Sequence, residues 1–154
     1  MCAFSNRRIH FIVVGGGEIH APPGISVENL GWRFSLTDVY ARCSALLRFT
    51  SHDGLSIMVL EALAFGRHVL WTQRFPFVRQ VLTPEQIVQS LDELLTLHAR
   101  GELQPQLNAA EFVRTAYDRE KCVRRIVSFW ESGRKAGKKS RHSSNSLRDV
   151  TESK

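Results

Sequence analysis

Asp53 and Glu61 are the residues of this sequence whose types and spacing best suit chemistry. Asp53 stands in a turn with Gly54, and Glu61 follows eight positions later, about two turns into the helix expected there. A helix start leaves backbone N–H groups without partners and favours negative charge, while carboxylates accept hydrogen bonds from hydroxyl groups. The arrangement therefore suits a ligand with an anionic part and a hydroxyl-rich part, such as a nucleotide-sugar.

Both acids also have a purely structural interpretation. An aspartate before a helix is a common N-cap, so Asp53 is either a ligand contact or a cap. Glu61 lies in an otherwise apolar helix, where we expect it to be buried. A buried carboxylate is costly unless it is paired, so Glu61 is either a ligand contact or half of a salt bridge.

Apolar segments flank this turn and helix and must position the acids. Residues 45–49 and 68–71 are typical of buried strands. The helix expected at 55–65 is apolar almost all round, which predicts burial on several sides, and Gly66 is typical of the position after a helix end.

The residues before position 45 continue the alternation of strands and helices. Strands are expected at 8–14 and 27–30, followed by a short helix capped by Ser35 or Thr37. The glycines at 15–17 have neither GxGxxG nor Walker spacing, so a plain turn is favoured over a phosphate-binding loop. The pattern predicts an α/β fold with a parallel sheet flanked by helices.

The part after residue 82 is predicted to be helical. Thr83, Pro84 and Gln86 form a helix start, with Thr83 as the cap. Two further helices are expected at 109–116 and 118–130. The second is expected to bury its apolar side chains, which are Cys122, Val123, Ile126, Val127, Phe129 and Trp130.

The positive charge is concentrated at the end of the chain. The 154 residues, 43% of them hydrophobic, correspond to about one domain with net charge +6. Residues 134–154 hold seven basic and two acidic residues, or +5, which leaves +1 for residues 1–133. We therefore expect a folded domain at 1–133 that does not bind nucleic acid, and a disordered basic tail at 134–154. The tail is either a solvated appendage or an adhesive for anionic lipid or nucleic acid.

Cysteines, histidines and hydropathy indicate a cytoplasmic protein without a metal. Three cysteines without a CxxC pair predict reduced thiols, and six histidines show no metal-ligand spacing. No apolar run is long enough for a membrane span or for the core of a signal peptide. The remaining form of membrane association is peripheral contact.

The two acidic motifs together resemble the carboxy-terminal, donor-binding domain of group 1 (family 4) glycosyltransferases. They read DGLS at 53–56 and EALAFG at 61–66. The resemblance covers roughly residues 8–130 and is most specific between Leu30 and Trp71. It implies a Rossmann-like parallel sheet, one half of a two-domain enzyme. The implied activity is retaining transfer of a hexose from a nucleotide-diphosphate sugar to a glycan or lipid-linked acceptor, as in polysaccharide biosynthesis, without a metal or cofactor.

The resemblance also implies a role for each motif residue. Glu61 would bind the ribose hydroxyls, and Asp53 would bind the donor sugar and stabilise positive charge developing at its ring. Gly54 and the backbone N–H groups of Leu55, Ser56 and Ile57 would face the diphosphate. Trp32 and Arg33 occupy the loop that would receive the base.

Several departures from the family pattern limit what the chain is expected to do alone. Asp53 replaces the usual glutamate, and Ser56 replaces a glycine. The family's first strand, its phosphate-binding lysine segment and the acceptor-binding domain are missing. We therefore expect an acceptor-binding partner chain or domain, and an isolated chain that binds donor weakly without turnover. The alternatives are a non-catalytic nucleotide-sugar-binding module and an α/β protein-interaction module.

Overall fold

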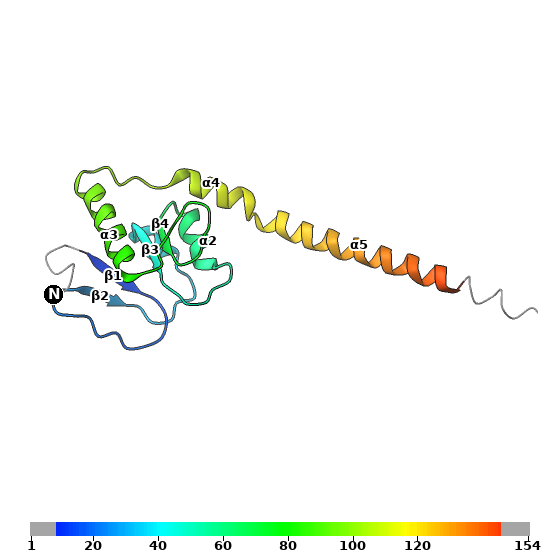
Figure 1. The fold of residues 1–154 in the computed structure, drawn as a ribbon, viewed down its shortest axis with the longest axis horizontal. Coiled ribbons are helices and arrows are strands. Elements are labelled where there is room, and N and C mark those ends of the chain that lie inside the picture. The colour runs from blue at the N-terminus through cyan, green and yellow to red at the C-terminus, as the bar shows by residue number, and fades with distance from the viewer. Residues whose placement is uncertain (1–8, 146–154) are drawn as a thin grey trace, which may run out of the picture. The chain divides into compact units, whose positions relative to one another are not determined.

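The computed structural model describes residues 9–145, with side chains described up to residue 133. It forms two compact units that divide between Phe112 and Val113. Figure 1 shows the order of the elements along the chain. They are β1 (His10–Val13), β2 (Ser26–Asn29), α1 (Thr37–Arg42), β3 (Ala45–Arg48), α2 (Ile57–Ala64), β4 (His68–Trp71), β5 (Val78–Gln80), α3 (Pro84–Ala99), α4 (Leu107–Ala116) and α5 (Arg119–Asn145).

The strands of the first unit form two small parallel sheets. β1 pairs with β2, with His10 opposite Ser26, and β4 lies between β3 and β5 in the second sheet. The predicted α/β class with parallel strands and flanking helices is confirmed. A Rossmann-like domain is expected to have one continuous sheet. The described strands instead form two separate sheets, because neither β1 nor β2 pairs with β3, β4 or β5.

The buried core of the first unit lies between Val39 and Ala110. β4 is its centre, because Val69, Leu70 and Trp71 are each at most 2% exposed. α2 covers β3 and β4 with the face that carries its buried residues Val59, Ala62 and Leu63. In contrast, no side chain of β1 or β2 is buried.

Local sequence signals account for the ends of α2 and α3. Gly66 directly follows the C-cap of α2 with φ +67°, the left-handed conformation that glycine adopts without strain. Before α3, the amide of Gln86 donates to the Thr83 hydroxyl at 3.3 Å, and Pro84 is the first helical residue. The Gln86 side chain accepts in return from the Leu82 amide at 2.6 Å. The predicted helix start is confirmed.

Some expectations about these elements are wrong. α2 is not buried on several sides, since Leu55 before it and Ile57 in its first turn are 52% and 71% exposed. Only one face of α2 has sheet strands to pack against. The N-cap of α1 is Leu36, and neither Ser35 nor Thr37 holds that position. The Ser35 hydroxyl nevertheless accepts from the Thr37 amide at 3.4 Å, next to the helix start. β5 was not predicted.

The second unit contains the long helix α5, and there the sequence expectation of burial fails. Its apolar side chains are exposed, from 49% for Val127 to 79% for Phe129, while Cys122 is half-buried. The expected disordered tail also differs, because residues 134–145 continue α5, and residues 146–154 lie outside the described part. Among the described residues, no helix combines the length and hydropathy needed to cross a membrane.

Candidate functional site

The turn between β3 and α2 holds Asp53 close to the end of its own strand. Arg48, the last residue of β3, donates from Nε to Asp53 Oδ2 in a short ion pair. The Thr50 hydroxyl lies 3.5 Å from the same oxygen. The Arg48 and Asp53 side chains are 28% and 13% exposed, so the pair is partly screened from water.

This environment keeps Asp53 ionised. The hydrogen bond from Arg48 is the largest cause that lowers the pKa of the Asp53 carboxyl, and the Arg48 charge adds to it. The indole N–H of Trp71 lies close enough to help lower this pKa, although its geometry falls short of a hydrogen bond, and it is buried without another partner among the described residues. Asp53 is therefore a carboxylate with one oxygen already engaged. Its predicted ligand contact stays a prediction.

Glu61 is exposed on α2, so the expectation that it is buried is wrong. Its Oε2 lies 3.1 Å from the hydroxyl of Tyr40 on α1. The same hydroxyl lies 3.3 Å from the Met58 carbonyl oxygen, and its one proton serves one acceptor at a time. Burial and the Glu61 charge raise the pKa of Tyr40, which therefore stays protonated and able to donate. No ion pair involves Glu61 within the described residues.

The start of α2 is open between these two acids. Ser56, its N-cap, makes no side-chain cap hydrogen bond, and the first turn contains no acidic residue. The backbone amides of residues 55–58 donate no hydrogen bond to any acceptor in the described part of the chain. A Cβ placed on Gly54 would meet nothing within 4 Å. The helix start therefore offers N–H donors without a protein acceptor and a partial positive charge. The space beside Gly54 is open and Leu55 and Ile57 are exposed, whereas Ser56 is 6% exposed.

Trp32 and Arg33 lie after β2, away from this turn in the chain, and both are exposed. Trp32 is 86% exposed, and its indole Nε1 would be 3.3 Å from a Cβ on Gly16. The ring thus lies against the glycine turn, where Gly15 and Gly17 have φ of +128° and +116°. No described hydrogen bond or ring contact joins Trp32 or Arg33 to Asp53 or Glu61.

Sequence reasoning missed Arg48 and Tyr40, which hold the two acids. Arg48 interrupts an apolar strand five positions before Asp53, and this interruption was the available signal. Tyr40 lies in the short helix expected after the strand at 27–30, where nothing in the sequence indicated a role for its hydroxyl. Its distance of 21 positions from Glu61 left no local spacing to reveal the contact.

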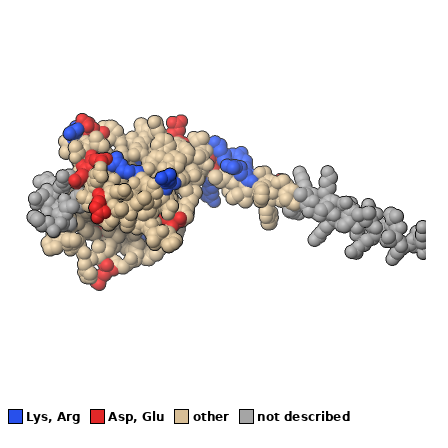
Figure 2. Space-filling model, viewed as in Figure 1, with Lys and Arg blue, Asp and Glu red and all other residues tan. Residues whose placement is uncertain are grey.

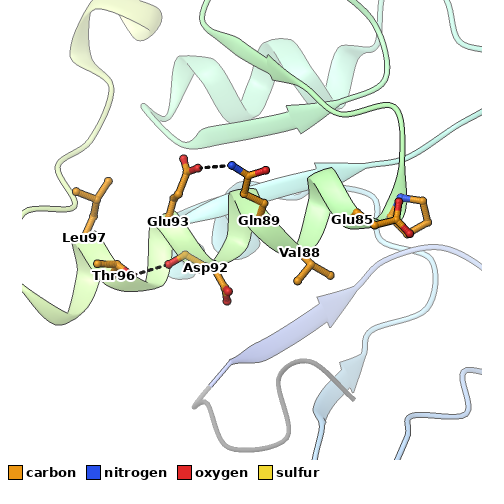
Figure 3. A pocket seen from close by; sticks show the side chains of 8 residues that line it. Glu85, Val88, Gln89, Asp92, Glu93, Thr96 and Leu97 are labelled. Atoms are coloured by element: carbon orange, nitrogen blue, oxygen red, sulfur yellow. Dashed lines mark hydrogen bonds between the residues drawn. The ribbon is translucent and has the colours of Figure 1, made fainter. Parts of the chain in front are cut away.

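A separate hollow lies along α3 (Figure 3). Among the described residues it is lined by α3 alone, through Pro84, Glu85, Val88, Gln89, Asp92, Glu93, Thr96 and Leu97. Three of these are acidic and none is basic, which disfavours an anionic ligand. The hollow contains none of the predicted site residues.

The described residues contain no group of three His, Cys, Asp or Glu side chains that could hold a metal ion. Cys43 and Cys122 are free thiols, and Cys2 lies outside the described part. Comparison with protein-family models, curated proteins and solved structures finds no match for this chain.

Proposed function

We propose that this chain is the donor-binding part of a retaining hexosyltransferase, similar to the carboxy-terminal domain of group 1 (family 4) glycosyltransferases and with its Rossmann-like fold. The observation that carries the proposal is the open start of α2, where unpaired amides lie between two carboxylates. A nucleotide-diphosphate sugar has the complementary chemistry, with a diphosphate for the amides and hydroxyl groups for the acids.

The charges around the turn support binding of a diphosphate. The amides of residues 55–58 have no protein acceptor among the described residues, and the helix dipole adds partial positive charge. Arg48 offsets part of the charge of Asp53, the nearest acid before the helix, so this carboxylate repels a diphosphate less. The diphosphate would lie at Gly54, Leu55, Ser56 and Ile57.

The two acids support different parts of the donor in this proposal. Glu61 is exposed and held by Tyr40, so its free carboxylate oxygen can accept from the ribose hydroxyls. Asp53 would accept from a hexose hydroxyl and stabilise positive charge at the sugar ring with its second oxygen. Trp32 and Arg33 would receive the base, which requires the loop after β2 to approach the start of α2.

The acceptor side of such a site would come from another domain or a partner chain. A cleft needs two walls to exclude water and hold the acceptor. The absence of buried side chains in β1 and β2 supports a further covering element, because parallel sheets are normally covered on both faces.

Calorimetric titration with uridine and guanosine diphosphates and their hexose conjugates tests the proposal. We expect weak binding by the wild type and roughly tenfold weaker binding by Glu61→Gln, because a hydrogen bond to a charged group is lost. Tyr40→Phe keeps the ring contact with Phe65 and should reduce the affinity less, since it only frees Glu61. The matched control Glu93→Gln removes an exposed acid on α3 and should bind like the wild type.

Equal heats for the wild type and Glu61→Gln, or no heat with any nucleotide, would contradict the proposal. The second outcome would favour the alternative of an α/β protein-interaction module. One observation supports that alternative, namely that Asp53 already has a protein partner in Arg48 and so has a structural role without any ligand.

A further inference from the structure

α5 carries an exposed apolar stripe over its first three turns. Val123, Ile126, Val127 and Trp130 have the i, i+3, i+4, i+7 spacing that places them on one face of a helix. These side chains are 51%, 68%, 49% and 73% exposed. Phe129 is also exposed, but at about 100° per residue it lies more than a quarter turn from the centre of this stripe. So much aliphatic and aromatic surface on one helix face calls for an apolar environment.

The opposite face of the same turns is basic. At about 100° per residue, Lys121, Arg124 and Arg125 lie more than a quarter turn from the centre of the stripe. Figure 2 shows Lys and Arg side chains grouped around the first turns of α5. The whole helix contains nine Lys or Arg residues against two Glu, so its charge complements an anionic surface.

We propose that α5 binds the surface of an anionic membrane, lying in the plane of the interface. The apolar stripe would enter the boundary between headgroups and acyl chains, and the basic side chains would contact anionic headgroups. An exposed apolar face with an aromatic anchor, here Trp130, opposite a face rich in Lys and Arg is the physical requirement for such a helix. This proposal does not depend on the proposed transferase function.

The sequence of α5 disfavours two other partners for this helix, a second copy of the chain and nucleic acid. A coiled coil with a second copy would need the apolar spacing to continue, but Gly133 and Gly137 occupy the next positions of the repeat. The basic second half of α5 would also repel its copy. Nucleic acid would pair with the basic residues but would leave Ile126, Val127 and Trp130 in water.

Vesicle binding by the full chain tests the proposal. The probes are vesicles of phosphatidylcholine with and without phosphatidylglycerol, read by co-sedimentation and by tryptophan emission in a Trp32→Phe background. There the 2% exposed Trp71 gives a constant contribution, and a shift reports Trp130. We expect binding and a blue shift only with phosphatidylglycerol. Ile126→Ser/Val127→Ser and Arg124→Gln/Arg125→Gln should each weaken the partition coefficient by roughly tenfold or more. Leu107→Ser, which removes a 73% exposed apolar side chain from α4, is the matched control and should bind like the wild type.

Three results would overturn the proposal. One is unchanged vesicle binding by Ile126→Ser/Val127→Ser, which would mean attraction by charge alone. Another is tighter binding to duplex DNA or RNA than to vesicles, with competition between them. The third is a dimer that depends on Ile126 and Val127 in a protein that does not bind vesicles. Circular dichroism of each variant checks that α5 is still helical, so that a change in vesicle binding is not caused by unfolding of the helix.

Discussion

The ion pair between Arg48 and Asp53 fixes the turn that leads from β3 into α2. Its physical origin is local, because the last residue of the strand reaches back over five positions to the carboxylate. The sequence showed an acid in a turn before a helix but not which base would hold it. Arg48 could equally have pointed to solvent, since alternation along a strand does not fix the partner of a half-buried side chain.

At this scale we predict that Asp53→Asn changes how stability depends on pH. The folded pKa of Asp53 is depressed, so its pairing contributes stability that is complete above the unfolded pKa of about 4 and is lost as the pH falls through the folded pKa. The variant should have a lower Tm at neutral pH and a flatter decline of Tm below about pH 5. Thermal unfolding followed by circular dichroism measures both.

Glu93→Gln is the control for this effect. It breaks the Arg79–Glu93 pair on the surface, where both side chains are more than 40% exposed, so the loss of Tm should be smaller. An unchanged pH slope in Asp53→Asn would show that the Arg48 pair does not stabilise the fold.

At the scale of the element, Gly66 determines where α2 ends and β4 can begin. Its φ is +67°, and a Cβ there would come within 3.3 Å of Pro105 Cβ. We expect Gly66→Ala to lower the free energy of unfolding by about 1–2 kcal/mol, the cost of a left-handed conformation with a side chain. Urea unfolding measures this loss. Gly54→Ala, with no left-handed φ and nothing within 4 Å, should change stability little, and a similar loss in both variants would contradict the argument.

The elements also show what periodicity can and cannot predict. The Thr83 cap, the end of α2 and the strand β4 follow from local backbone and hydrogen-bond requirements, and they were predicted. Burial of α5 was predicted wrongly because an apolar stripe has the same spacing whether a core covers it or leaves it open. The exposure of Glu61 was missed for the same reason. Apolar neighbours along a helix do not show that another element covers the face on which Glu61 lies.

At the scale of the molecule, burial is uneven between the two sheets. Three of the four residues of β4 are buried, whereas β1 and β2 contain no buried side chain. Local opening requires little free energy where few apolar contacts are lost. We predict that the amides of β1 and β2 exchange with deuterium at least about tenfold faster than those of β4. Exchange measured by mass spectrometry tests this, and equal protection of the two sheets would mean that β1 and β2 are covered after all.

The sheet topology has a kinetic consequence. Each described strand pairs only with a strand next to it along the chain, β1 with β2, β3 with β4, and β4 with β5. The widest separation of paired residues is the 23 positions between Ala45 and His68, and the entropy lost in closing a loop grows only slowly with its length. The strands can therefore assemble in the order in which a ribosome releases them, one neighbour at a time.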